Sequence, residues 1–211
     1  MISTHTRHLI AQLGDALQRP LPGPAAQALM SPDPRPGAGR NLASHPDCRQ
    51  AGVLALLYPS GEDLCLVLTL RTQSVESHRG QISFPGGAMD PGETPEETAL
   101  REAYEELGIN PLELDVLGKL TSLYIPHSGY CVHPVVAYAG ERPAFIPNRE
   151  EVAEVIEAPI SLLLAPDTAC EEVWQIRGVP ARVPFYAVGS HKVWGATAMM
   201  LCELLALFHE K

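Results

Sequence analysis

The chain has 211 residues, of which 45% are apolar and 19% are charged, and its formal net charge is −10. These are the proportions of a globular protein that can bury its own core, and the negative field argues against binding to duplex nucleic acid. An anionic substrate would need local positive charge, from arginine or from a bound cation.

The five cysteines are scattered and include no CxxC pair, so the sequence predicts neither a zinc site nor a disulfide framework. Free thiols favour a reducing compartment. The apolar residues near the N-terminus are interrupted by polar ones, and the apolar stretch 196–208 is broken by Glu203 and is too short to span a bilayer. We therefore expect a cytoplasmic protein with no membrane partner.

The N-terminal part predicts a helix followed by a connector. Leu9, Leu13 and Leu17 recur at helical spacing within residues 3–18, which indicates an amphipathic helix that packs on the domain or forms a homodimer contact. Seven prolines within residues 20–48 predict an extended segment without helix or ladder bonds. The expected division is an arm of residues 1–48 and a main domain of residues 49–211.

Strand patterns begin at Gly52 and continue through the main domain. Residues 53–57 and 64–71 flank a Pro-Ser-Gly turn and predict a hairpin. Further on, the pattern predicts a short extended segment at 81–84, a helix at 94–107, strands at 114–124, 131–139, 151–157 and 182–186, and a closing helix at 196–208. Because the elements do not alternate regularly, we expect an α/β/α sandwich with a mixed sheet and not a doubly wound parallel sheet.

The helix at 94–107 carries the clearest chemical signal. Thr94 and Glu97 form a predicted capping box, and Gly108 supplies the C-terminal stop. Three glutamates lie opposite the apolar stripe of this helix, at positions i, i+3 and i+4: Glu102, Glu105 and Glu106. Carboxylates so placed repel one another, and their hard oxygens suit Mg²⁺ or Mn²⁺, so the spacing predicts a divalent metal site.

A longer pattern surrounds these glutamates. Gly87 is followed after five residues by Glu93 and after seven more by the run Arg101–Ile109, and this arrangement resembles the box of the Nudix hydrolases. The resemblance implies an α/β/α sandwich in which Glu102, Glu105 and Glu106 bind the metal. It also implies that water attacks a phosphorus of a nucleoside diphosphate linked to another group.

The same resemblance assigns the residues around the helix. Arg101 and Glu93 would brace the loop against the helix. Gly86 and Gly87 would let the backbone approach the metal or the phosphate closely. The proton acceptor stays open: Glu105 could serve if the metals engage mainly Glu102 and Glu106, and Glu151 and Glu154 are outside candidates.

A second region narrows the expected substrate. Residues 67–71, Gly80 and residues 84–87 resemble the upstream signature of coenzyme A pyrophosphatases, and the likeness runs from about Ala51 to the C-terminus. It implies cleavage of coenzyme A or acyl-coenzyme A to 4′-phosphopantetheine and adenosine 3′,5′-bisphosphate. Glu76 stands where this subgroup has an arginine, so Arg71, His78 or Arg79 would have to supply the positive charge to the substrate.

Several side chains outside the box are further candidates, and two other functions stay open. His127 or His133 could touch a substrate phosphate, and Phe84, Tyr130 or Trp194 could stack on an adenine ring. The first alternative keeps the chemistry but uses ADP-ribose, a dinucleotide or a nucleoside triphosphate. The second is a Nudix-fold regulator that binds a ligand without catalysis.

Overall fold

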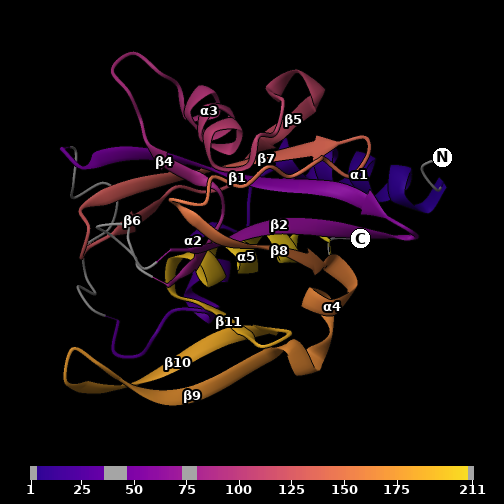
Figure 1. Cartoon of the computed structure of the whole chain (residues 1–211). Helices are drawn as coiled ribbons and strands as arrows, with labels where there is room; N and C mark the ends of the chain where they lie inside the picture. The colour runs from indigo at the N-terminus through magenta and orange to yellow at the C-terminus, as the bar shows by residue number, and fades with distance from the viewer. Residues whose placement is uncertain (1–3, 36–46, 73–79, 209–211) are drawn as a thin grey trace.

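The computed structural model describes residues 4–35, 47–72 and 80–208 (Figure 1). Its main sheet is built around β1 (Arg49–Ser60), which pairs antiparallel with β2 (Asp63–Arg71) and parallel with β7 (Tyr130–Ala139). The remaining strands of this sheet are β3 (Ile82–Ser83), β4 (Gly86–Ala88), β5 (Leu114–Lys119), β6 (Leu123–Ile125) and β8 (Val152–Pro159). A second, antiparallel sheet has the order β11 (His191–Trp194), β10 (Val179–Val188), β9 (Ala169–Ile176).

The helices cover both faces of the main sheet. Figure 1 shows α3 (Pro95–Leu107) above this sheet, α2 (Gly23–Leu29) and α5 (Gly195–Ala206) below it, and the small sheet beyond α5. The other helices are α1 (Thr4–Leu17) and α4 (Ile160–Leu164). Short 3₁₀ turns lie at Pro111–Glu113 and Pro166–Thr168. This is the predicted mixed α/β/α sandwich.

The residues of β1 explain why the sheet lies between two helical layers. Leu54, Leu56 and Tyr58 belong to the apolar cluster on the α3 side, whereas Ala55 and Leu57 belong to the cluster that includes α5. Successive side chains of a strand point to opposite faces. A continuous apolar run therefore indicates a strand that is buried on both sides, which is the case here.

The N-terminal segment differs from its prediction. The helix over residues 3–18 is confirmed as α1, and its apolar stripe packs within the same chain: Leu13 is 1% exposed. The apolar stripe that suggested a homodimer contact is therefore already covered by residues of the same chain. Residues 20–48 were predicted to be extended, but residues 23–29 form α2. Proline is tolerated there because Pro24 lies in the first turn, where a helix needs no backbone N–H, and Ala and Leu follow.

A buried carboxylate fixes α2 onto α5. Glu203 of α5 has no exposed surface, and it accepts hydrogen bonds from the backbone N–H of Gly23 (3.2 Å), from the backbone N–H of Thr121 (3.1 Å) and from Nε2 of Gln27 (2.8 Å). Asp33 then forms a two-way backbone bridge with Arg182 of β10. The predicted absence of ladder bonds in this segment is therefore wrong as well.

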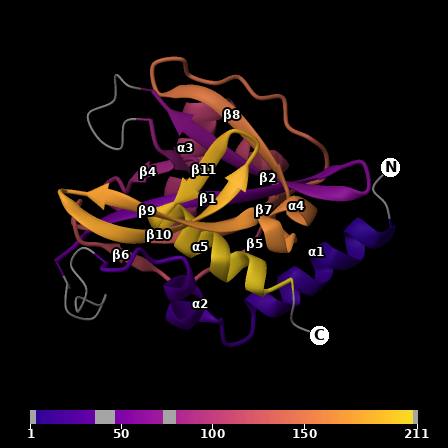
Figure 2. The same ribbon diagram turned by 90° about the horizontal axis from the view of Figure 1, so that it is seen from below.

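Figure 2, seen from below, shows α5 and the small sheet in front of the main sheet, with α2 next to α5. The sequence prediction missed two strands of that sheet, β9 and β11. β9 escaped detection because its central residues Glu171, Glu172 and Val173 are all exposed, and so it shows no alternation of buried and exposed side chains. The predicted strand 114–124 is two strands, β5 and β6.

The cysteines also correct an expectation. Cys48 and Cys131 form a disulfide with a Cα–Cα distance of 5.7 Å, whereas Cys65, Cys170 and Cys202 are free. The pair lies beside adjacent parallel strands, where Gln50 is in register with Cys131, and this proximity is not visible in the sequence spacing. The free-thiol argument for a cytoplasmic location is thereby weakened, and that location stays a prediction. Among the described residues, no helix has the length and apolar character needed to cross a membrane.

Candidate active site

Helix α3 begins and ends at the predicted residues. The Thr94 hydroxyl accepts a hydrogen bond from the backbone N–H of Glu97 (3.2 Å), and the Glu97 carboxylate accepts one from the backbone N–H of Thr94 (2.8 Å). Gly108 ends the helix at φ 69°. A Cβ at Gly108 would also lie 2.9 Å from Cβ of Ile146, so the position requires glycine for two reasons. These caps fix the rotation of the helix and with it the direction of its glutamates.

The glycines before the helix let the chain pass between β1 and α3. A Cβ at Gly86 would lie 2.4 Å from the backbone oxygen of Gly52, and a Cβ at Gly87 would lie 2.4 Å from Oε1 of Glu102. The Glu102 carboxylate therefore occupies the space that any larger residue at position 87 would fill. This is a close approach of backbone to a charged side chain, and it gives a physical reason for the glycine pair.

Arg101 connects three of the predicted site residues. Its Nε lies 2.7 Å from Oε1 of Glu93, and its Nη1 donates to Glu102 (2.8 Å) and to Glu105 (3.1 Å). Nη2 also donates to the backbone oxygen of Ala88 in β4 (3.0 Å). The bonds from Arg101, together with those from the Asp90 backbone N–H and the Thr98 hydroxyl, lower the pKa of Glu93 to about 2. The structure thus brings together the loop, β4 and the helix through one guanidinium.

Glu106 is the most buried of the three helix glutamates. It is 1% exposed, and this burial, opposed by Arg71 and reinforced by the charges of Glu102 and Glu151, raises the pKa of its carboxyl to about 7. Nη1 of Arg71 lies 3.2 Å from Oε1 of Glu106. The other oxygen, Oε2, is buried and has no hydrogen-bond partner among the residues that the structure describes. A buried carboxylate oxygen left without a donor is unfavourable unless something else compensates its charge.

These residues fit a hard divalent cation. Burial and the neighbouring carboxylates Glu105 and Glu151 also raise the pKa of Glu102, although Arg101 opposes the effect. A cation would relieve the mutual repulsion of the carboxylates and would satisfy Oε2 of Glu106. Over the described residues, no three acidic, histidine or cysteine side chains already converge on one point. Arg71 and Arg101 instead donate hydrogen bonds to oxygens of all three helix glutamates. The metal ligands Glu102, Glu105 and Glu106 therefore stay a prediction that the donor chemistry supports.

The candidates for a proton acceptor differ in their surroundings. The side chain of Glu105 is 52% exposed beside Arg101. Glu151 is close enough to raise the pKa of both Glu102 and Glu106, and its Oε1 accepts a hydrogen bond from Asn148. Oε1 of Glu154 lies 3.2 Å from Nε2 of His191, and the Glu154 side chain is 51% exposed. Glu105 thus has the most open position among the three helix glutamates.

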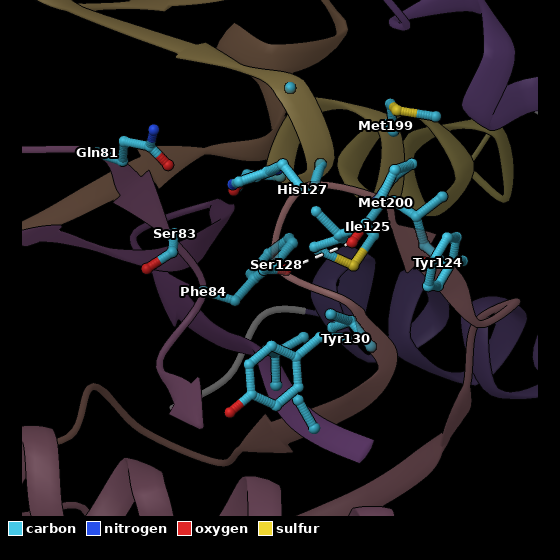
Figure 3. Close-up of a pocket in the computed structure, with 18 of the residues that line it drawn as sticks. Gln81, Ser83, Phe84, Tyr124, Ile125, His127, Ser128, Tyr130, Met199 and Met200 are labelled. Atoms are coloured by element: carbon cyan, nitrogen blue, oxygen red, sulfur yellow. Dashed lines mark hydrogen bonds between the residues drawn. The ribbon is translucent and has the colours of Figure 1, made fainter. Parts of the chain in front are cut away.

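A cavity of about 810 Å³ adjoins this group and is the main candidate for the substrate site. Arg71, Gly86 and Gly87 line it, as do the aromatic candidates Phe84, Tyr130 and Trp194 and the histidine His127. Figure 3 shows Phe84, Tyr130, Ile125 and Met200 around this space, with the Ser128 hydroxyl bonded to the Ile125 backbone oxygen. His133 is not among the lining residues, and its ring nitrogens contact Ser122 and Gln50 instead.

The cavity wall includes residues that were not predicted, and some of the predicted residues lie outside the described part of the chain. Glu76, His78 and Arg79 lie outside the described residues. Three arginines that the sequence analysis did not single out also line the cavity: Arg35, Arg49 and Arg177. Arg35 lies in the proline-rich segment, Arg49 opens β1 and Arg177 lies in the β9–β10 turn. No local pattern marks them, because only the folded chain brings these segments together.

Comparison with known proteins agrees with this geometry. The sequence model of the NUDIX domain matches residues 48–176. The chain is 32% identical over 175 residues to "Nudix hydrolase 3" of Caenorhabditis elegans, an alignment that covers 74% of this chain and 72% of that protein. It is 38% identical over 140 residues to "Uncharacterized Nudix hydrolase NudL" of Photorhabdus laumondii, covering 66% and 74%.

A further relative is named for its substrate. The chain is 38% identical over 161 residues to the human "Mitochondrial coenzyme A diphosphatase NUDT8", with 74% of this chain and 63% of that protein covered. The capped α3, the glycine pair and the Arg101 contacts are all within the matched region. The chain is therefore a member of the Nudix hydrolase family and a pyrophosphohydrolase.

Proposed function

We propose that the chain hydrolyses the pyrophosphate bond of coenzyme A or an acyl-coenzyme A, with Mg²⁺ or Mn²⁺, to 4′-phosphopantetheine and adenosine 3′,5′-bisphosphate. The observation that carries the proposal is the position of the cavity: it begins at Gly86, Gly87 and Arg71, next to the α3 glutamates, and it is about 810 Å³ in volume. Ligand cavities of about 300–1,000 Å³ bury most of a drug-sized molecule. The relative named as a coenzyme A diphosphatase supports the choice of substrate.

In this proposal the chain's own residues hold and orient the reacting groups. Mainly Glu102 and Glu106 would hold the divalent ion, with Glu105 kept for proton transfer, and the ion would supply positive charge to the phosphate oxygens and make water more acidic. Arg101 keeps Glu93, Glu102 and Glu105 in place through its fork of donors. The absence of a side chain at Gly87 leaves room for the Glu102 carboxylate beside the backbone that lines the cavity.

The proton of the attacking water goes to Glu105 in this scheme. Its half-exposed side chain can reach water, whereas Glu106 is buried against Arg71. As the oxygen of water forms a bond to phosphorus, the bond between that phosphorus and the bridging oxygen breaks. Most of the rate enhancement would come from positioning and electrostatic stabilisation, as in other phosphoryl transfers.

Product analysis tests the proposal. The purified chain is incubated with coenzyme A, ADP-ribose and a dinucleoside polyphosphate, each with Mg²⁺, with Mn²⁺ and with EDTA, and the products are identified by mass spectrometry. We expect phosphopantetheine and adenosine 3′,5′-bisphosphate from coenzyme A only when a metal is present. If the protein hydrolyses another compound and releases no phosphopantetheine from coenzyme A, coenzyme A is not its substrate.

Variants test the roles of the residues. Glu106→Gln should lower kcat by at least about 100-fold, because a ligand of the metal is lost. Glu113→Gln, which exchanges an exposed glutamate outside the site, is the matched control and should keep full activity. Unchanged activity of Glu106→Gln would remove that residue from the metal site.

A further inference from the structure

The cavity beside the α3 glutamates is strongly positive in an otherwise acidic protein. The formal net charge of the chain is −10, yet none of the described residues that line the cavity is an aspartate or a glutamate. Four arginines line it: Arg35, Arg49, Arg71 and Arg177. Arg71 contacts Glu106 and belongs to the site already described. The other three bring positive charge that the reaction at the pyrophosphate does not use.

These three arginines have no carboxylate partner within residues 4–35, 47–72 and 80–208. In the part of the chain that the structure describes, neither Arg35, Arg49 nor Arg177 forms an ion pair with a carboxylate. Nη2 of Arg35 donates to the backbone oxygen of Tyr124 (3.2 Å), and the Arg49 guanidinium lies 4.2 Å from the centre of the Tyr130 ring. Such neutral partners orient a guanidinium but leave its charge available to a ligand.

Arg35 and Arg177 are neighbours although they lie far apart in the sequence. Both also line a second cavity of about 190 Å³, together with Pro34, Ile176, Val179 and Ala181. The backbone bridge between Asp33 and Arg182 holds the two segments against each other. Figure 1 shows the β9–β10 hairpin and α3 on opposite sides of the main sheet, so this pair approaches the cavity from the side away from the glutamates.

The N-terminal segment is therefore part of the cavity wall. Residues 31–35 follow α2, which Glu203 anchors to α5 through Gly23 and Gln27. The family match begins at residue 48, so Arg35 comes from outside the matched region. A residue supplied in this way can set specificity without altering the box that performs the chemistry.

We infer that Arg35 and Arg177 form a subsite for a second anionic group of the substrate, a phosphate monoester separate from the pyrophosphate. The inference rests on the proposed function and specifies its substrate class: nucleoside diphosphate derivatives that carry an additional phosphate, as coenzyme A does on its ribose. A planar guanidinium matches the oxygens of a phosphate with two parallel hydrogen bonds. ADP-ribose and simple dinucleotides carry no such group and would leave the pair unoccupied.

Kinetics with a matched pair of substrates test the subsite. We expect wild-type protein to prefer coenzyme A to dephospho-coenzyme A, which lacks only the additional phosphate. In Arg35→Gln and in Arg177→Gln, kcat/KM for coenzyme A should fall about tenfold each, through KM, because a charge-assisted hydrogen bond is lost. The value for dephospho-coenzyme A should not change. Arg182→Gln is the control, since this arginine pairs with Glu171 and does not line the cavity.

A binding measurement separates this inference from the proposed reaction. Titration calorimetry without metal compares adenosine 3′,5′-bisphosphate with AMP for the wild type and for the double variant of Arg35 and Arg177. A preference for the bisphosphate that the double variant loses supports the subsite, even if coenzyme A proves not to be the substrate. Equal affinities in the wild type, a preference that survives in the double variant, or equal kinetic losses for both coenzymes would overturn it. Arg35→Lys and Arg177→Lys should retain part of the preference for the bisphosphate, because lysine keeps the positive charge but lacks the planar pair of donors.

Discussion

Replacing Glu106 by glutamine should make the stability of the metal-free protein less dependent on pH. Burial raises the pKa of the Glu106 carboxyl to about 7, whereas its ordinary value is 4.5. Between these two values the folded protein binds more protons than the unfolded chain. The free energy of unfolding of the wild type therefore falls as the pH rises through this range, and it levels off above pH 7. Glutamine does not titrate, so the variant lacks this contribution.

The magnitude follows from the two pKa values. One pKa unit corresponds to about 1.4 kcal/mol, so the difference between the unfolding free energies of the variant and the wild type should grow by about 2 to 3 kcal/mol from pH 5 to pH 8. The variant also loses the contact between Arg71 and Glu106, which changes the difference in unfolding free energy by a similar amount at every pH. The change with pH is therefore the quantity to compare, and the absolute stability is not.

Urea unfolding in the presence of EDTA, followed by tryptophan fluorescence at several pH values, measures this difference. Glu113→Gln is the control for exchanging an exposed glutamate by glutamine. Adding Mg²⁺ at pH 8 should stabilise the wild type more than Glu106→Gln, because binding to the folded state alone raises stability. Parallel pH curves for Glu106→Gln and the wild type would refute the argument that burial raises the pKa of this carboxyl.

Three further changes have defined outcomes. Gly87→Ala would place a Cβ 2.4 Å from Oε1 of Glu102 and should lower kcat by about 100-fold with little change in Tm, whereas Gly140→Ala, which meets nothing within 4 Å, should keep full activity. Cys48→Ser opens the disulfide and should lower the unfolding free energy by up to about 4 kcal/mol in urea, and a reductant should then destabilise only the wild type. Glu203→Ala removes the acceptor of three hydrogen bonds, two of them fully buried, and should lower the unfolding free energy by at least about 3 kcal/mol; a loss below about 1 kcal/mol would show that α2 does not depend on it.

The catalytic helix was predictable because its signals are local. The capping box of Thr94 and Glu97, the stop at Gly108 and the spacing of the three glutamates all lie within one short segment. Helical periodicity converts that spacing directly into a shared face. The contact between Arg101 and Glu93 joins the middle of the helix to the residue before its N-cap, and Nε of Arg101 lies 2.7 Å from Oε1 of Glu93.

The N-terminal segment shows where local reasoning failed. Proline content predicted an extended connector, but α2 forms because Pro24 lies in its first turn and because Glu203 supplies acceptors for its N-terminal N–H and for Gln27. The partner that stabilises α2 lies near the other end of the chain. No window of sequence around residue 23 contains it.

The sequence by itself determined the two-sided burial of β1, the limits of α3 and the row of glutamates, since each depends on residues a few positions apart. Tertiary structure decided which oxygen of Glu106 finds a partner among the described residues, how far the pKa of its carboxyl rises and which arginines line the cavity. Burial and charge depend on every segment that packs around a group. Arg35 and Arg177 become neighbours only when the chain has folded, so their shared role is a property of the structure and not of any sequence pattern.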